Sequence, residues 1–187
     1  MDNSKKWIEK SSKVVYSNKI ASIVEHSCYL PSRCVDNLFY STRMPDWVNV
    51  FPVTNDGKVI MVQQHRVARD IVTLEVPAGA MDKGETPYEA ALRELEEETG
   101  FVPEQLIQLK EVIVNPAIQT NTCYVFIALN CKQLKNTDFD DTEELEVELM
   151  DLDQVWHLLK SDVIDNSLNH LSMMLSRDYI KENGLYA

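Results

Sequence analysis

Three glutamates within one helical turn are the group of residues best suited to chemistry. They are Glu94, Glu97 and Glu98, inside the stretch GAMDKGETPYEAALRELEEETGF that runs from residue 79 to 101. Like charges this close repel one another, and the repulsion grows as the site loses water. Arg93 precedes Glu97 by one turn and is expected to pair with it, which leaves Glu94 and Glu98 without a basic neighbour on the helix. A hard divalent cation such as Mg²⁺ prefers carboxylate oxygens. A solvated acidic surface is the alternative interpretation.

A helix must position these carboxylates, and its signals are clear. Thr86 and Glu89 form a capping-box pair, Pro87 occupies the first helical position, and Gly100 suits a left-handed end. At about 100° per residue the apolar side chains form one stripe, with the glutamates in the neighbouring sector. The carboxylates are therefore expected beside the core. The apolar stripe consists of Tyr88, Ala91, Leu92 and Leu95.

The spacing favours a metal site over a solvated surface. Gly79, then Glu85 after five residues, then the run from Arg93 to Phe101 after seven more resembles the Nudix box GX5EX7REUXEEXGU at every fixed position, where U is aliphatic or aromatic. Nudix enzymes hydrolyse nucleoside diphosphates linked to another moiety. The resemblance implies a divalent metal held by the box glutamates in a loop-helix-loop.

The likeness extends beyond the box. The runs Gln63-Gln64-His65-Arg66 and Leu74-Glu75-Val76-Pro77-Ala78-Gly79, with Pro116 sixteen residues after Gly100, are similar to the ADP-sugar pyrophosphatase branch, which includes ADP-ribose pyrophosphatase. This resemblance covers roughly residues 35 to 180. It implies an α/β/α sandwich with a mixed sheet, an N-terminal β subdomain that mediates homodimerisation, and a site built partly from both subunits.

Matched position by position, the resemblance implies a role for each box residue. The metal ligands would be Glu94 and Glu98, the backbone carbonyl of Ala78, and Glu97 directly or through water. Mg²⁺ is the expected ion, with Mn²⁺ as an alternative. Arg93 would orient the glutamates. Glu85 would support the structure around them.

Three positions outside the box are expected to contact substrate: Arg43, Trp47 and Arg66. Arg66 matches an arginine that contacts substrate phosphate, a task suited to a bidentate guanidinium; a surface charge at the end of a strand is the alternative. Trp47 matches aromatics that stack on the base, and a core tryptophan is the alternative. Residues 115 to 121 depart from the Ser-Pro-Gly-like run of many ADP-ribose-type members, which leaves the terminal sugar open.

A general base is expected in the acidic run from residue 136 to 144. In the resembled enzymes a glutamate of this loop helps to activate water. Glu143 is the first choice and Asp141 the second, because an exposed loop can close on the substrate and exclude water. The alternative is a merely solvated loop, with catalysis by the box glutamates. The reaction would give a nucleoside monophosphate and a sugar phosphate.

Composition limits the other classes of function. The 187 residues carry a formal net charge of −12, which argues against nonspecific binding to nucleic acid or to an anionic membrane. The N-terminus has no long apolar segment, so no signal peptide or membrane span is expected, and a reducing cytoplasm is the expected compartment. Four scattered cysteines fit neither a zinc site nor a redox motif, and Cys123 and Cys131 are expected to be buried free thiols. The four histidines are expected to have ordinary structural roles.

The order of elements predicts an α+β fold. Residues 1–45 contain three β-like runs and form a small antiparallel subdomain, and residues 46–187 form the Nudix domain. In the second part, strands 47–54 and 58–65 flank the turn Asn55-Asp56-Gly57, a hairpin signal. Further strands are expected at 73–76, 106–114, 122–129 and 145–150, and helices at 151–159 and 167–181. The segment Pro77-Ala78-Gly79 is expected to break the strand pattern ahead of the box.

Two competing functions stay open. In the first alternative, the same chemistry acts on a nucleoside triphosphate or a dinucleoside polyphosphate, although an N-terminal β subdomain argues against this substrate. A Nudix domain that binds a nucleotide sugar without cleaving it is the other alternative. Such domains usually have lost box glutamates, and none is missing here.

Overall fold

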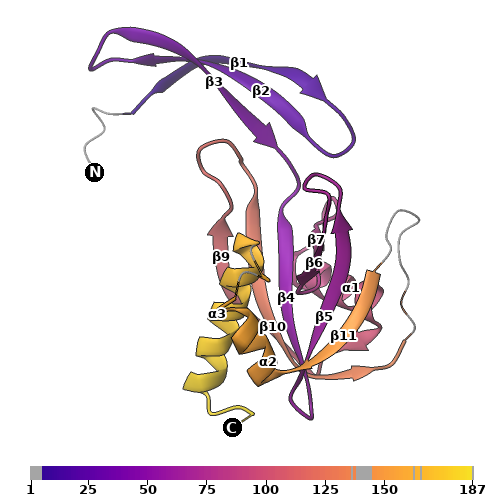
Figure 1. Cartoon of the computed structure of the whole chain (residues 1–187). Coiled ribbons are helices and arrows are strands. Elements are labelled where there is room, and N and C mark those ends of the chain that lie inside the picture. The colour runs from indigo at the N-terminus through magenta and orange to yellow at the C-terminus, as the bar shows by residue number, and fades with distance from the viewer. Residues whose placement is uncertain (1–5, 136, 138–144, 162, 165, 187) are drawn as a thin grey trace. The chain divides into compact units, whose positions relative to one another are not determined.

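The computed structural model describes residues 6–135, 137, 145–161, 163–164 and 166–186. Within them, eleven strands and three helices belong to two compact units (Figure 1). Unit 1 consists of residues 1–46 and 113–122, and unit 2 of residues 47–112 and 123–187. Unit 1 thus includes a segment that lies outside the expected boundaries of 1–45.

Unit 1 contains a three-stranded sheet in the order β1-β2-β3, built from β1 (Ile8–Ser17), β2 (Ser22–Leu30) and β3 (Val35–Arg43). Both strand pairs are antiparallel, as the sequence predicted. The later segment joins the end of β3, because the Thr42 N–H donates to the Ile118 carbonyl at 2.7 Å and the Thr120 N–H donates to the Thr42 carbonyl at 3.2 Å.

One face of this small sheet is rich in exposed apolar side chains. The strand register places Tyr16 opposite Ile23, and Leu38 and Tyr40 on the same face as Ile23. Leu38 is 49% and Tyr40 51% exposed. We call this set the β1–β3 apolar face; its members are Ile8, Tyr16, Ile23, Leu38 and Tyr40.

Unit 2 is a mixed sheet with the path β11-β5-β4-β10-β8, to which β6 adds on β5, β7 on β4 and β9 on β10. β4 and β10 are parallel, whereas β4 is antiparallel to β5 and β7. The strands are β4 (Trp47–Thr54), β5 (Lys58–Arg66), β6 (Ile71–Glu75), β7 (Ala78–Ala80), β8 (Phe101–Val102), β9 (Gln105–Ile113), β10 (Thr122–Gln133) and β11 (Leu145–Asp151); the helices are α1 (Pro87–Thr99), α2 (Leu152–Leu158) and α3 (Ser167–Glu182).

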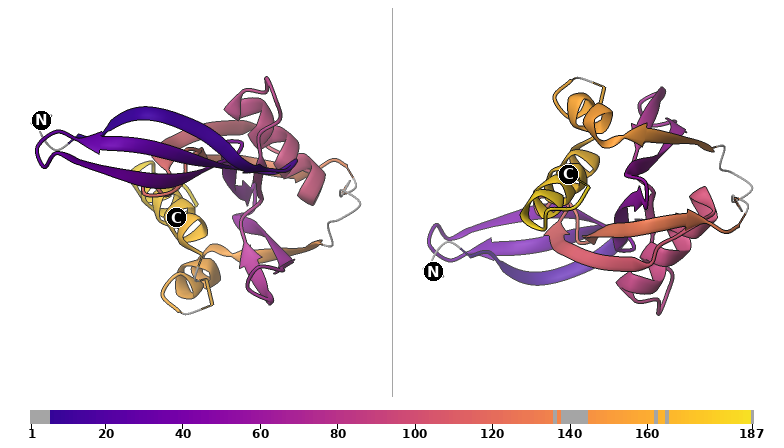
Figure 2. Two further views of the ribbon diagram at one scale, coloured as in Figure 1. Left: turned by 90° about the horizontal axis from the view of Figure 1, so that it is seen from above. Right: turned by 90° about the horizontal axis from the view of Figure 1, so that it is seen from below.

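The sheet of unit 2 is buried on both faces, which makes three layers. Along β4, Val48 and Val50 pack with α1, whereas Phe51 and Val53 pack with α2 and α3. Successive side chains of a strand point to opposite faces, so one strand serves both cores. Figure 2 shows α1 on one side of the strands and α2 with α3 on the other. This confirms the predicted α/β/α sandwich with a mixed sheet.

The predicted hairpin between β4 and β5 is confirmed. The Gly57 N–H donates to the Thr54 carbonyl at 3.1 Å, and the Thr54 hydroxyl donates to the Asp56 carboxylate at 2.6 Å. Gly57 has a φ of 80°, a left-handed conformation that glycine adopts at little cost. The turn therefore sets the pairing of two strands that lie at the centre of the core.

Two short strands differ from the prediction. The segment Pro77-Ala78-Gly79 was expected to break the strand pattern, but Ala78–Ala80 forms β7 and pairs with Trp47, Val48 and Asn49 of β4. Phe101–Val102, the end of the box, forms β8 against β10. Both strands are two or three residues long and find partners far away in sequence. Local pattern does not reveal such pairings.

All four cysteines are free, and Cys123 and Cys131 are buried, as the sequence predicted. Burial raises the pKa of each of these two thiols to about 12, so both stay protonated near neutral pH. Among the described residues no helix is long and apolar enough to cross a membrane.

Candidate functional site

Helix α1 begins and ends as the sequence predicted. The Thr86 hydroxyl accepts from the Glu89 N–H at 3.3 Å, and the Glu89 carboxylate accepts from the Thr86 N–H at 2.8 Å, which completes the capping box. Gly100 ends the helix with a φ of 74° and donates to the Glu96 carbonyl at 2.8 Å. Both ends are thus fixed by local chemistry, which sets the position of the carboxylates between them.

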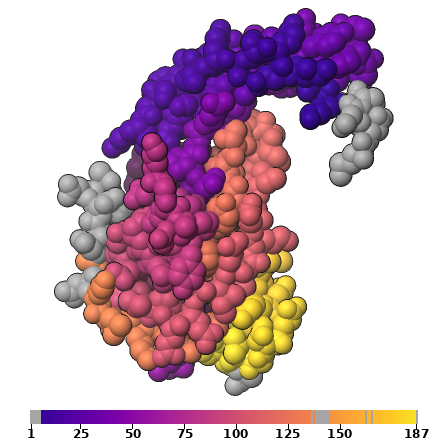
Figure 3. Space-filling model, turned by 180° about the vertical axis from the view of Figure 1, so that it is seen from behind, coloured from indigo at the N-terminus to yellow at the C-terminus, as the bar shows by residue number. Residues whose placement is uncertain are grey.

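The buried face of α1 includes two of the three glutamates. Glu94 is 9% and Glu98 3% exposed. The apolar stripe was predicted correctly at Ala91 and Leu95, but Tyr88 is 49% exposed, and Leu92 is only partly buried. The buried set is Ala90, Ala91, Glu94, Leu95, Glu98 and Thr99. Figure 3 shows the side of unit 2 that α1 covers.

Arg93 is the centre of an ion-pair network. Its guanidinium donates to both oxygens of Glu85, at 2.8 and 3.0 Å. It also donates to Glu94 at 2.9 Å, to Glu97 at 3.1 Å and to the Ala80 carbonyl at 3.0 Å. The sequence-based expectation that Glu94 has no basic neighbour was therefore wrong: an arginine side chain adjacent in sequence folds back far enough to reach it. The expected pair with Glu97 is confirmed.

The interactions within this network favour the ionised forms of Glu85 and Arg93. Hydrogen bonds from Arg93 are the main reason that the pKa of Glu85 is lowered. Hydrogen bonding to Glu85, followed by the charge of Glu94, raises the pKa of Arg93 in spite of partial burial. The guanidinium thus fixes a side chain from the loop and two side chains from the helix in one arrangement.

The segment before the box closes over the buried glutamates. The Ala78 N–H donates to the Glu98 carboxylate at 3.2 Å. At Gly79, an added Cβ would lie 2.0 Å from Oε1 of Glu94 and 2.1 Å from its carboxyl carbon. A larger residue at this position would displace the Glu94 carboxylate from where it now lies. Strand β7 holds the segment there by pairing with β4.

The donor set fits a hard divalent cation. Glu94, Glu97, Glu98 and the Ala78 carbonyl offer only oxygen atoms, the ligands that Mg²⁺ and Mn²⁺ favour. Among the described residues no three His, Cys, Asp or Glu side chains form a ready metal cluster. Glu97 accepts a hydrogen bond from Arg93, and its side chain is 45% exposed. The role of these four groups as metal ligands stays a prediction.

A second network surrounds Arg66 at the end of β5. Its guanidinium donates to both oxygens of Glu75, at 2.8 and 2.7 Å. Glu75 is 2% exposed and also accepts from the Thr73 hydroxyl at 2.5 Å and from Asn169 Nδ2 at 3.1 Å. Burial alone raises the pKa of Glu75, but the hydrogen bonds of Arg66, Thr73 and Asn169 outweigh it and leave the pKa lowered.

The other predicted site residues have different positions. Trp47 opens β4, half-buried, with its backbone between Cys123 of β10 and Ala80 of β7. Arg43 ends β3 in unit 1 and is exposed. Glu143 and Asp141, the predicted general bases, lie outside the described residues. The structure therefore brings together Ala78, Arg93, Glu94, Glu97 and Glu98.

Sequence reasoning missed Asn169, on α3. It is 1% exposed, and its Oδ1 accepts from the Val76 N–H at 2.6 Å while its Nδ2 donates to Glu75. One side chain thus connects α3 to the segment that leads into the box. A buried asparagine on the apolar side of a helix is the only sequence signal that points to it.

A mixed sheet between helix layers, with buried helix glutamates beside a glycine segment, agrees with the Nudix domain that the box pattern predicted. Comparison with known sequences agrees: a sequence model of the NUDIX domain matches residues 45–170. The chain belongs to the NUDIX domain family.

Two relatives and one solved structure show the extent of the similarity. The chain is 32% identical over 148 residues to the ADP-ribose pyrophosphatase of Bacillus subtilis, covering 79% of this chain and 80% of that protein. It is 33% identical over 126 residues to the methanol dehydrogenase activator of Bacillus methanolicus, covering 67% and 68%. A crystal structure of an ADP compounds hydrolase matches with a TM-score of 0.85 at 23% identity, over 96% of this chain and 97% of that one, which shows a shared fold.

Proposed function

We propose that the protein is a Mg²⁺-dependent hydrolase that cleaves the diphosphate linkage of a nucleoside diphosphate sugar such as ADP-ribose, with Mn²⁺ as an alternative ion. The observation that carries this proposal is the intact box, with Glu94 and Glu98 buried against the Ala78-Gly79 segment. The Bacillus subtilis relative, an ADP-ribose pyrophosphatase, supports the choice of substrate.

The residues of the site would have two separate roles, metal binding and orientation of the ligands. Glu94, Glu97, Glu98 and the Ala78 carbonyl would hold the metal. When bound, the metal neutralises the diphosphate charge and lowers the pKa of bound water. Arg93 keeps the glutamates oriented through its bonds to Glu85, Glu94 and Glu97.

Residues outside the box would select the substrate. Arg66, whose side chain is 42% exposed and bonded to Glu75, would contact a substrate phosphate. Trp47 would stack on the base, Arg43 would add a further contact, and Glu143 or Asp141 would take the proton from the attacking water.

We further propose that the protein is a homodimer and works in the cytoplasm. A three-stranded sheet with exposed apolar side chains gains stability when a second copy covers it. The β1–β3 apolar face offers such a surface. A reducing compartment keeps its four cysteines as free thiols.

A product-resolved screen at fixed Mg²⁺ tests the substrate. Purified protein is incubated with ADP-ribose, ADP-glucose, GDP-mannose and ATP, and the products are separated by ion-exchange chromatography. The proposal predicts AMP and ribose 5-phosphate from ADP-ribose. Pyrophosphate release from ATP with no monophosphate from any of the three nucleotide sugars would overturn it.

A further inference from the structure

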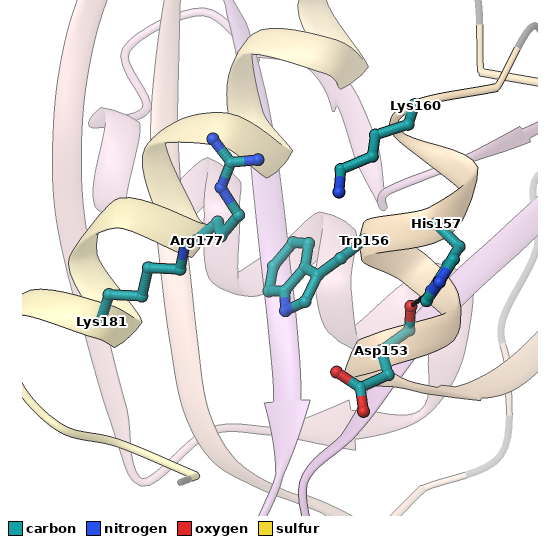
Figure 4. Close-up of a pocket in the computed structure, with 6 residues that line it drawn as sticks. All are labelled: Asp153, Trp156, His157, Lys160, Arg177 and Lys181. Atoms are coloured by element: carbon teal, nitrogen blue, oxygen red, sulfur yellow. Dashed lines mark hydrogen bonds between the residues drawn. The ribbon is translucent and has the colours of Figure 1, made fainter.

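A pocket on the outer surface of α2 and α3 carries an unusual set of side chains (Figure 4). Its volume is about 240 Å³. We call it the α2–α3 pocket; it is lined by Asp153, Trp156, His157, Lys160, Arg177 and Lys181. These helices cover the face of the sheet opposite to α1 (Figure 2), so the pocket is separate from the box glutamates.

The pocket concentrates positive charge in an acidic protein. The lining includes three basic side chains, Lys160, Arg177 and Lys181, and one carboxylate, that of Asp153, whereas the whole chain has a formal net charge of −12. Within the described part of the chain, neither lysine has an acidic partner within 4.0 Å. Both lysines are exposed, so their charges are available to a ligand at the pocket.

Arg177 supplies an unsatisfied donor. Its Nε is buried and, among the described residues, has no hydrogen-bond acceptor. The carboxylate of Asp178 forms an ion pair with it at 3.6 Å, which is too long for a hydrogen bond. The Arg177 side chain lines the pocket and is 24% exposed, so its positive charge can attract an anion there.

Trp156 gives the pocket a rigid wall. Its indole stacks on Phe51, with ring centroids 5.5 Å apart and an interplanar angle of 10°, and Phe51 is fully buried. Figure 4 shows the indole between the side chains of α3 and those of α2. On the α2 side, His157 Nδ1 donates to the Asp153 carbonyl at 2.6 Å, which fixes the imidazole beside the opening.

We propose that the α2–α3 pocket binds a phosphate group, as inorganic phosphate or as the monoester of a small sugar. Two lysines and an arginine are side chains that recognise phosphate oxygens. The size argues against a larger ligand, because 240 Å³ lies below the roughly 300 to 1,000 Å³ of pockets that enclose drug-sized molecules. A complete nucleotide sugar therefore does not fit.

The test is a titration of the metal-free protein, observed by NMR at the indole N–H of Trp156. A Trp156→Phe variant assigns the resonance. Inorganic phosphate and ribose 5-phosphate are added separately at constant ionic strength, with chloride as the reference anion because exposed charges are screened by salt. We expect a saturable shift with phosphate, and tighter binding of ribose 5-phosphate if the natural ligand is a monoester.

The decisive variant is Lys160→Gln with Lys181→Gln. Neither lysine has a described ion pair, so the fold is expected to survive, and the affinity should fall by about tenfold or more. The matched control is Lys19→Gln with Lys110→Gln, which removes the same charge at two exposed lysines that do not line the pocket. A shift that does not saturate with either probe, or equal affinity of both double variants, would overturn the proposal. ADP-ribose hydrolysis by the decisive variant should equal that of the wild type, which separates this test from that of the proposed function.

Discussion

At the scale of single residues, Arg93 explains how three glutamates share one turn. Its guanidinium makes hydrogen bonds to Glu85, Glu94, Glu97 and the Ala80 carbonyl. An acidic helix face normally repels itself, but here an arginine with five donors in a planar fork satisfies several acceptors at once. The arrangement fixes the carboxylates of Glu85, Glu94 and Glu97 relative to one another.

Replacing Arg93 with Gln should therefore lower the free energy of unfolding by about 2 kcal/mol, because partly buried carboxylates lose their partner. Urea denaturation at pH 7 measures the change. Arg69→Gln, at an exposed arginine in the turn after β5, is the control and should change stability by less than about 0.5 kcal/mol. Equal effects of the two variants would contradict the role assigned to Arg93.

The free energy of unfolding of the wild type and that of Arg93→Gln should depend differently on pH. The lowered pKa of Glu85 means that its contribution to stability is present above its ordinary pKa and is lost as the pH falls through the folded-state value. The stability difference between wild type and Arg93→Gln should consequently shrink between neutral pH and acid. A difference that stays constant or grows as the pH falls would speak against this linkage.

At the scale of elements, α3 is tied to the box segment by one buried side chain. Asn169 accepts from the Val76 N–H and donates to Glu75, which in turn holds Arg66. The helix thus fixes both the segment that leads to Ala78 and the arginine expected to contact phosphate. A helix of the opposite layer therefore contributes to the geometry of the site.

Asn169→Leu should remove about 2 to 3 kcal/mol of stability, because the buried Val76 N–H and the Glu75 carboxylate each lose a hydrogen bond. Asn183→Leu makes the same chemical change at the exposed end of α3 and should cost less than about 1 kcal/mol. Thermal unfolding of both variants provides the comparison. If Asn169→Leu were as stable as wild type, the link between α3 and the box segment would be unimportant.

Elements with local sequence signals could be predicted, whereas elements that depend on distant partners could not. Helix α1 was predictable because Thr86, Glu89, Pro87 and Gly100 act locally. The hairpin at Gly57 was predictable for the same reason. Strand β7 and the role of Asn169 were not, since both depend on partners that are distant in the chain, at Trp47 to Asn49 and at Glu75 and Val76. The match to the box supplied the site residues, but not the way Arg93 distributes its bonds.

At the scale of the whole molecule, acidity and phosphate chemistry are compatible. A chain with a net charge of −12 repels a free nucleotide, and the proposed metal at the box would provide the attraction. The β1–β3 apolar face is exposed in a single chain, and the proposed second copy would cover it.

Leu38→Glu places a charge on the β1–β3 apolar face, where Leu38 is 49% exposed. Burying an unpaired carboxylate in an interface is costly, so the variant should shift the protein from dimer to monomer. Sedimentation velocity measures the mass. Leu134→Glu, at a leucine 69% exposed in unit 2, serves as the control and should leave the dimer intact. A monomeric wild type would contradict the proposed assembly.

A Glu98→Gln variant tests whether the buried box glutamates support the proposed metal-dependent hydrolysis. The amide keeps an oxygen that can accept from the Ala78 N–H, so circular dichroism should show an intact fold. Turnover of ADP-ribose at saturating Mg²⁺ should fall by about two orders of magnitude or more, with weaker Mg²⁺ binding measured by calorimetry. A folded Glu98→Gln protein that releases AMP at the wild-type rate would contradict the account.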